Sequence, residues 1–218
     1  GKEIWGLAKL ADDFELAGGD EVKGYLLINQ PHAAGKAMTI KFTPIRVVCN
    51  NTLTMALQGE GTALRMPHVK EFDADVRAAA EEALGLSSQA IADFKEKADF
   101  LASRQFKQES VLNYIAELYQ PQILVDKAKS ITDEEFVMQE KFNTTATQVL
   151  QNIDLSPGAT MKSAKGTWWG ALNGVTYLED HQRRATAVGN ALHSSWFGAG
   201  ANRKAKALDK ALEYANVG

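Results

Sequence analysis

Residues 22–42 read VKGYLLINQPHAAGKAMTIKF, and this stretch decides the expected fold. Two runs of apolar and β-prone residues, Val22 to Asn29 and Met38 to Phe42, flank a loop at residues 31–35 that contains proline and glycine. Short apolar runs bounded by turn-forming residues are typical of strands, and consecutive strands usually pair with each other. The stretch therefore predicts two neighbouring antiparallel strands.

The sequence on either side extends this sheet. Residues 4–10 predict a preceding strand, with a turn at residues 17–20, which gives a three-stranded antiparallel meander. Residues 45–58 predict a helix packed on the sheet, because Thr43 and Pro44 stand at its start and apolar residues then recur at helical spacing. Residues 64–66 predict a short fourth strand at the sheet edge, which Pro67 stops.

From residue 71 onward the pattern is helical. Residues 76–84 carry one apolar stripe that ends at Gly85, and a second stripe recurs over residues 91–101. Further helices are expected at residues 109–119, from a capping box at 132–135 onward, at 167–181, and at 187–215 with a break near 198–200. The sequence thus predicts an α+β fold: a small antiparallel three- to four-stranded sheet with a helix packed on it, plus a larger helical part. Residues 1–70 form the sheet unit, and residues 71–218 pack with it in one continuous domain.

Composition is that of a globular protein. The chain has 218 residues, 45% of them hydrophobic, and no apolar run approaches the roughly 20 residues of a membrane span. The one cysteine, Cys49, cannot form an internal disulfide, which favours a cytoplasmic location. The chain begins at Gly1 and enters a strand almost at once, so we expect it to be the C-terminal part of a longer protein that has a further N-terminal region.

The charge is distributed unevenly. The net charge is +1 over residues 1–70, −8 over residues 71–140 and +4 over residues 141–218. An acidic centre argues against a protein that binds nucleic acid over its whole surface, but it leaves room for a local basic strip at the two ends.

Sequence motifs for catalysis and metal binding are absent. The chain contains no CxxC, HExxH or phosphate-binding glycine loop, so no metal, cofactor or catalytic residue is predicted. Cys49 has the chemistry of a nucleophile, but it falls on an apolar stripe, where a free cysteine behaves as a small hydrophobe. We therefore expect a non-enzymatic protein with a buried Cys49.

Polar and basic residues near the two ends are the candidate ligand-binding groups. Asn50 and Asn51 are unusual inside the predicted helix, and their amides either bond the neighbouring backbone or contact a ligand together with Arg46. Arg203, Lys206 and Lys210 share one face of the last helix, which is either plainly solvated or binds phosphate. The predicted nucleic-acid-binding residues are Lys41, Arg46, Asn51, Arg65, Lys165, Arg183, Arg184 and Arg203.

Aromatic residues admit two interpretations. Trp168 and the apolar residues one and two turns after it form a stripe that fits a helical core, with Gly170 and Gly174 allowing close approach of a neighbour, although an exposed tryptophan could stack on a base. Trp196 and Phe197 precede a glycine-rich break, and we predict that they contribute to a contact between subunits, the alternative being that they close the protein's own core.

Three stretches carry a resemblance to a known family: KFTPIRVVCNNTL at residues 41–53, GTWWGALNGVTYLEDH at 166–181 and SSWFGAGANRKAKAL at 194–208. They resemble the phage/plasmid-like family of unknown function numbered nine hundred and thirty-two. The resemblance implies a mobile-element context and supplies no catalytic residues. The order of three strands and a helix is also similar to the core of phage single-strand annealing proteins of the Redβ and RecT kind, which is an analogy of fold alone.

These observations lead to one expected function and one alternative. We expect a non-enzymatic protein of a phage or plasmid that binds and anneals single-stranded DNA in recombination or replication. It would act as a homo-oligomer in the host cytoplasm, without membrane contact. The alternative is a structural or protein-interaction factor of a mobile element that does not contact nucleic acid.

Overall fold

The computed structural model describes residues 3–32, 36–55, 64–66, 74–120, 142–183 and 188–217. The chain divides into two compact units. We call them the sheet unit, made of residues 1–15 and 21–96, and the helical unit, made of residues 16–20 and 97–218. The boundary near residue 96 falls within a helix.

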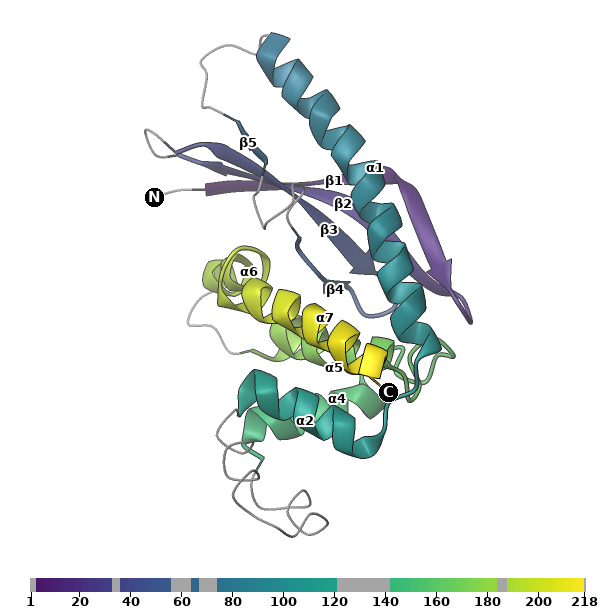
Figure 1. Ribbon diagram of the computed structural model, residues 1–218. Coiled ribbons are helices and arrows are strands. Elements are labelled where there is room, and N and C mark those ends of the chain that lie inside the picture. The colour runs from purple at the N-terminus through teal and green to yellow at the C-terminus, as the bar shows by residue number, and fades with distance from the viewer. Residues whose placement is uncertain are drawn as a thin grey trace. The chain divides into compact units, whose positions relative to one another are not determined.

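The sheet unit is built on the predicted meander. Strands β1 (Glu3–Leu16), β2 (Asp20–Pro31) and β3 (Met38–Arg46) lie in that order in one sheet, with β2 and β3 antiparallel (Figure 1). All three strands are longer than the apolar runs that predicted them. Gly18 and Gly19 in the first turn have φ of 89° and 79°, a conformation that glycine adopts without a steric penalty.

The helix predicted at residues 45–58 is wrong over residues 45–55, the part of it that the structure describes. Residues 43–46 continue β3, the chain turns at residues 47–50, and it returns as β4 (Asn51–Thr52) beside β3. Asn50 occupies the left-handed region of the turn with φ of 54°, which asparagine tolerates better than most residues. The segment is rich in β-branched residues, and a neighbouring strand was available for pairing, so tertiary pairing outweighed the helical spacing.

The short edge strand is confirmed. Strand β5 (Leu64–Met66) pairs antiparallel with β3, placing Arg65 opposite Thr39.

Helix α1 (Ala74–Ser103) crosses the sheet without interruption (Figure 1). The predicted end at Gly85 is therefore wrong. The hydroxyl of Ser87 donates to the carbonyl of Leu84 at 2.7 Å, so this serine is satisfied inside the helix rather than as a cap. The stripe predicted at residues 91–101 is confirmed: its four apolar members are buried, and Phe94 packs against Phe14 of β1 with ring centroids 6.0 Å apart.

The helical unit packs around helix α5 (Trp168–Tyr177). The other elements are α2 (Gln108–Tyr119), α4 (Thr144–Leu155), the π-helix η2 (Leu178–Gln182), α6 (Val188–Trp196) and α7 (Ala199–Val217). Nine of the ten residues of α5 are buried, which confirms the core interpretation of the Trp168 stripe. A Cβ on Gly170 would lie 2.0 Å from the carbonyl oxygen of Ala164, so this glycine permits the close approach that its spacing predicted.

The helices expected at 109–119, 167–181 and 187–215 are present, the last one broken at residues 197–198 as predicted. The capping box at 132–135 lies outside the described residues. Among the described residues, α4 begins at Thr144, where the Asn143 side chain caps the helix by accepting from the Ala146 amide at 2.9 Å.

Candidate nucleic-acid interface

Two loops of the helical unit are joined by backbone hydrogen bonds, and we call them the basic loop pair. One comprises residues 104–107, between α1 and α2, and the other comprises residues 156–167, between α4 and α5. The Phe106 amide donates to the Gly166 carbonyl at 3.0 Å, and the Trp168 amide donates to the Arg104 carbonyl at 3.0 Å. Segments about fifty residues apart in the chain are thereby held side by side.

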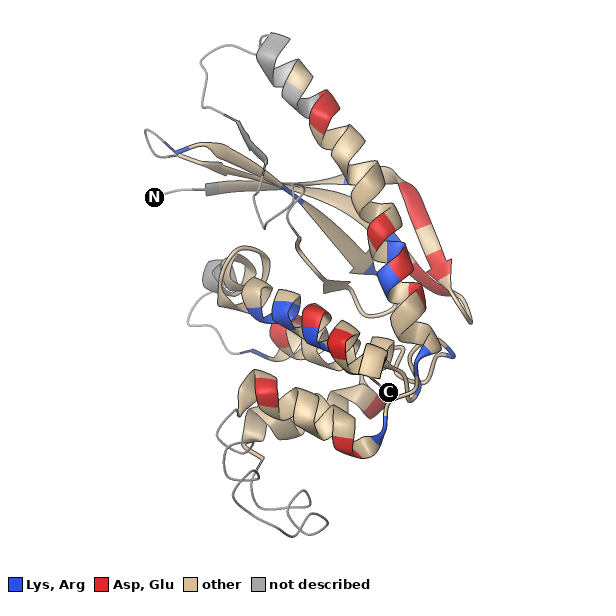
Figure 2. Cartoon of the chain, viewed as in Figure 1, with Lys and Arg blue, Asp and Glu red and all other residues tan. Residues whose placement is uncertain are grey.

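The basic loop pair carries four exposed cations and no acidic residue. The cations are Arg104, Lys107, Lys162 and Lys165. Within the described ranges none of the four forms an ion pair. The Arg104 guanidinium lies over the Phe100 ring, 5.1 Å from its centroid. Figure 2 shows basic residues on these loops, close to where α1 ends. The pair is therefore a local positive patch whose cations form no ion pair among the described residues.

Buried hydrogen bonds fix the longer loop. Thr167 caps α5 by accepting from the Gly170 amide at 3.2 Å, and its hydroxyl donates to the Ser163 carbonyl at 2.6 Å. Ser163 in turn donates to the Asp20 carboxylate at 2.6 Å, and the Trp169 indole N–H donates to the same oxygen at 3.0 Å. Asp20 and Ser163 are fully buried, so the loop that carries two of the lysines is anchored to the core.

One aromatic ring accompanies the cations. Phe106 is half-buried and contacts Trp168 edge-on, with centroids 6.0 Å apart. Trp168 and Trp169 are only 1% and 3% exposed, so neither presents a face to a ligand. Phe106 is thus the ring of the basic loop pair that a base could reach.

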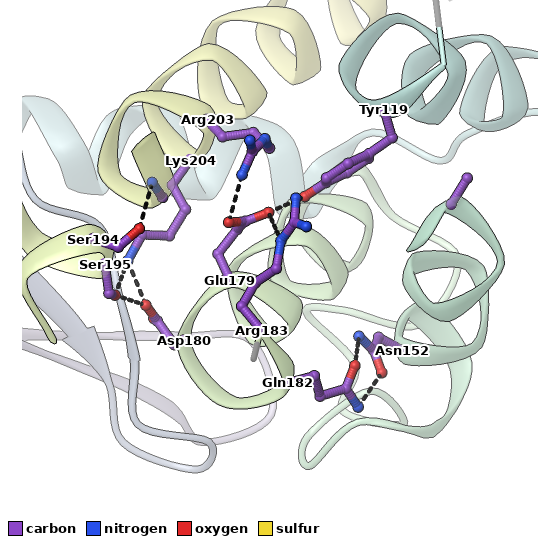
Figure 3. Close-up of polar contacts among 12 residues, drawn as sticks. Tyr119, Asn152, Glu179, Asp180, Gln182, Arg183, Ser194, Ser195, Arg203 and Lys204 are labelled. Carbon is purple, nitrogen blue, oxygen red and sulfur yellow. Dashed lines mark hydrogen bonds and ion pairs between the residues drawn. The ribbon is translucent and has the colours of Figure 1, made fainter. Parts of the chain in front are cut away.

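A second polar group, the Glu179 cluster, lies at the far end of α5. The Glu179 carboxylate accepts hydrogen bonds from Tyr119 Oη at 2.8 Å, Arg203 Nη1 at 2.8 Å and Arg183 Nε at 3.2 Å (Figure 3). Its side chain is 1% exposed. Burial, followed by the Glu179 charge and hydrogen bond, raises the pKa of Tyr119 well above its ordinary value, so the phenol stays protonated and donates.

The next acid along the π-helix makes its own buried pair. Lys204 Nζ lies 2.5 Å from Asp180 Oδ1 and 3.1 Å from Ser195 Oγ, and Ser195 donates to the same carboxylate (Figure 3). Burial lowers the pKa of Lys204, and the Asp180 charge opposes that shift. Successive acids on η2 therefore pair with successive bases on α7, Arg203 with Glu179 and Lys204 with Asp180.

A reciprocal amide pair attaches the same π-helix to α4. Asn152 Nδ2 donates to Gln182 Oε1 at 2.9 Å, and Gln182 Nε2 donates back to Asn152 Oδ1 at 3.1 Å. A π-helix is rare and costs regular helical bonding, and such segments are frequent at functional sites.

The basic residues predicted in the sheet unit are divided between its two faces. Arg46 pairs with Asn51 in the strand register, and both are buried, at 3% and 4% exposure. They share the α1-facing side with Gly24, whose backbone contacts Ile91. Lys41 lies on the opposite face and is half-buried, and burial lowers its pKa.

Arg65 is opposite Thr39 in the strand register. The structure therefore does not gather the predicted residues of this unit into one strip.

The residues predicted in the helical unit also separate. Lys165 belongs to the basic loop pair, whereas Arg183 and Arg203 belong to the Glu179 cluster. Arg184 lies outside the described residues. Trp196 and Phe197, at the end of α6, are partly exposed.

The predicted basic face of α7 is paired with partners. Arg203 bonds Glu179, as described above. Lys210 Nζ lies 3.1 Å from a carboxylate oxygen of Glu117 and 2.7 Å from a carboxylate oxygen of Glu213. Lys206 Nζ lies 3.5 Å from the Glu117 carbonyl oxygen. Sequence reasoning missed Arg104, Lys107 and Lys162, because their closeness depends on the pairing of two distant loops. Their signal in the sequence was the absence of acids within residues 104–107 and 156–167.

Cys49 is buried as expected, although in a turn rather than a helix, with Sγ 4.0 Å from the Arg46 carbonyl. Among the described residues no three histidine, cysteine or carboxylate side chains are grouped to hold a metal ion. Of the helices that the structure describes, none combines the length and apolarity needed to cross a membrane.

These features define a class: an α+β protein in which a unit with a five-stranded sheet precedes, along the chain, a helical unit with a basic loop pair. The chain belongs to the family described as Domain of unknown function (DUF932), whose model matches residues 1–207. This agrees with the resemblance of the three quoted stretches. No curated protein and no solved structure matches the chain.

Proposed function

We propose that the protein binds single-stranded nucleic acid through the basic loop pair, without catalysing a reaction. The observation that carries the proposal is the set of four exposed cations on two hydrogen-bonded loops that contain no acid. Clustered Lys and Arg side chains neutralise backbone phosphates and release counterions, which supplies most of the sequence-independent affinity for nucleic acid.

The aromatic ring between the loops favours a single strand over a duplex. In a single strand the bases are free to stack, and a base on an aromatic side chain contributes about 1–3 kcal/mol. Phe106 is half-buried, and its packing on Trp168 holds it next to the lysines. In a duplex the bases are paired and stacked already, so only the phosphate contacts remain.

We further propose a role in annealing, as a homo-oligomer of a phage or plasmid. The support is the antiparallel meander of β1, β2 and β3, which is similar to single-strand annealing proteins in architecture only, although β4 and β5 come between this meander and α1. Strand β1 is at one end of the strand order, and its Ile4 and Leu7 are 58% and 42% exposed. Edge strands with exposed apolar residues are prone to pair with another chain.

The test is fluorescence anisotropy with a labelled single-stranded oligonucleotide across a salt series. Four phosphate contacts predict a slope of log affinity against log salt of about −3, which is a loss of about 50-fold between about 50 and 200 mM salt. In the triple variant Lys107→Gln, Lys162→Gln, Lys165→Gln the slope should fall to about −1. A second variant, Phe106→Leu, should weaken the single strand roughly 5- to 150-fold and leave any duplex binding unchanged.

The matched control is Lys206→Gln, which removes an exposed positive charge from α7, outside the loops. It should change neither slope nor affinity. If the full chain binds neither single-stranded nor double-stranded DNA at low salt, the proposal fails and the protein-interaction alternative replaces it. If the triple variant keeps the wild-type slope, the basic loop pair is not the interface.

A further inference from the structure

The Glu179 cluster contains two cations for one anion. Arg183 and Arg203 both bond the Glu179 carboxylate, and their guanidinium carbons lie 5.8 and 5.7 Å from the centroid of the Tyr119 ring. Tyr119 is a protonated phenol and adds no negative charge. The cluster therefore holds a formal excess of one positive charge, and the neighbouring Lys204 and Asp180 cancel each other.

Much of the hydrogen-bonding capacity of the two arginines is unused. Arg183 bonds Glu179 through Nε, and Arg203 bonds it through Nη1. Over the part of the chain that the structure describes, the two Nη groups of Arg183, and Nε and Nη2 of Arg203, make no hydrogen bond. Their side chains are 40% and 29% exposed, so these N–H groups are open to a ligand.

Both guanidiniums are also held in place. Glu179 lies on the π-helix, and the phenol of Tyr119 donates a further hydrogen bond to its carboxylate. Packing over an aromatic ring restrains each guanidinium plane. Two restrained guanidiniums with N–H groups that make no hydrogen bond among the described residues are suited to a tetrahedral oxyanion, because Arg bonds phosphate in a bidentate manner.

We propose that Arg183 and Arg203 form a binding site for a phosphate group, with Glu179 and Tyr119 as positioning residues. A terminal phosphomonoester fits better than an internal phosphodiester, because its second negative charge complements two guanidiniums of which only one is neutralised. The source is either free phosphate or the end of a nucleic acid, and the same N–H groups would bind both. The site is independent of the basic loop pair, from which α5 separates it by roughly 15 Å of helix.

The first arm of the experiment uses inorganic phosphate and the full chain. At about ten times its Kd, phosphate should raise Tm by about 3–6 °C relative to chloride at equal ionic strength. Arg183→Gln keeps the Arg203–Glu179 pair but removes the charge-assisted hydrogen bonds from Arg183 to the phosphate. It should therefore weaken phosphate binding by about tenfold or more. Arg183→Lys keeps the charge but not the fork, and should fold as the wild type does while still losing affinity. Lys206→Gln is the control and should bind phosphate as the wild type does.

The second arm compares one oligonucleotide with and without a 5′ phosphate. A nucleic-acid end is identified as the ligand if the wild type binds the phosphorylated form more tightly. This preference should be lost in Arg183→Gln and retained in the triple lysine variant of the loops. Equal binding of the two forms, together with a response to inorganic phosphate, identifies free phosphate. The inference is refuted if phosphate leaves Tm unchanged, or if Arg183→Gln and Arg183→Lys both bind it as tightly as the wild type. Because the loop variants test DNA binding separately, either proposal can fail while the other stands.

Discussion

Replacing Lys204 by methionine is the most informative test of the helical unit. Lys204 is a lysine with no exposed surface, and its partner Asp180 has a side chain that is 6% exposed. Methionine keeps the length of the aliphatic stem and removes only the ammonium group. Asp180 then keeps Ser195 as a hydrogen-bond donor but loses the ammonium group that lies 2.5 Å from its carboxylate.

The expected cost follows from that burial. Breaking a buried ion pair by removing one partner costs about 3–5 kcal/mol, because the remaining charge is uncompensated. For a protein of this size, a loss of 1 kcal/mol lowers Tm by roughly 2–4 °C, so Lys204→Met should lower it by roughly 6–20 °C. The double variant Lys204→Met, Asp180→Leu removes both charges and should recover most of this loss, which leaves about 1–3 kcal/mol for the Ser195 hydroxyl that no longer has a partner.

The assay is urea unfolding monitored by circular dichroism. It is applied to the four proteins of the double-mutant cycle, which are the wild type, the two single variants and the double variant. Lys206→Met is the control: it is two residues away on α7 but exposed, and should change stability by less than about 0.5 kcal/mol. A cost below about 1 kcal/mol for Lys204→Met would show that the ammonium is not buried against Asp180. A double variant no more stable than the single one would contradict the claim that the uncompensated charge causes the loss.

Two further predictions concern tyrosine ionisation and glycine packing. Burial raises the pKa of Tyr114 and Tyr119 in the folded state, so their contribution to stability is complete below the unfolded-state pKa of about 10 and is lost as pH rises above it. The urea concentration at the midpoint of unfolding should therefore decrease between about pH 9 and 11. Tyrosinate absorbance should show that these two phenols ionise only on unfolding, and ionisation within the folded protein would contradict the burial. Gly170→Ala should destabilise the protein by about 1–3 kcal/mol or more, because the added Cβ would overlap a backbone carbonyl. Gly85 lies inside α1 with open space around it, so Gly85→Ala should stabilise the protein by about 0.5–1 kcal/mol. The Tm values of the two variants should shift in opposite directions, and shifts of the same sign would refute the packing argument.

Local patterns in the sequence determined the strands and most helices. The three strands of the meander follow from apolar runs that turn residues separate, and the edge strand at residues 64–66 from its short apolar run before Pro67. The core role of α5 follows from Trp168 and its two glycines, since four-residue spacing places them on neighbouring turns of one helix. These features depend on residues that are close in the chain, so the sequence displays them directly.

Only the tertiary structure decided the features that depend on distant partners. Residues 45–58 have a helical spacing of apolar side chains, but strand pairing with β2 and β4 places Ile45 and Arg46 in β3. The stop expected at Gly85 does not occur, because α1 packs its later turns on the sheet and the gain from that packing exceeds the cost of one internal glycine.

The candidate sites are decided by the tertiary structure in the same way. Lys165 was identifiable as a basic residue, but its closeness to Arg104 arises from backbone bonds between loops about fifty residues apart. Arg183 and Arg203 were identifiable as cations, whereas their shared carboxylate, Glu179, is found only when α2, α7 and the π-helix meet. Sequence gives the charges and the periodicity of the chain, and packing decides which charges are neutralised and which remain open to a ligand.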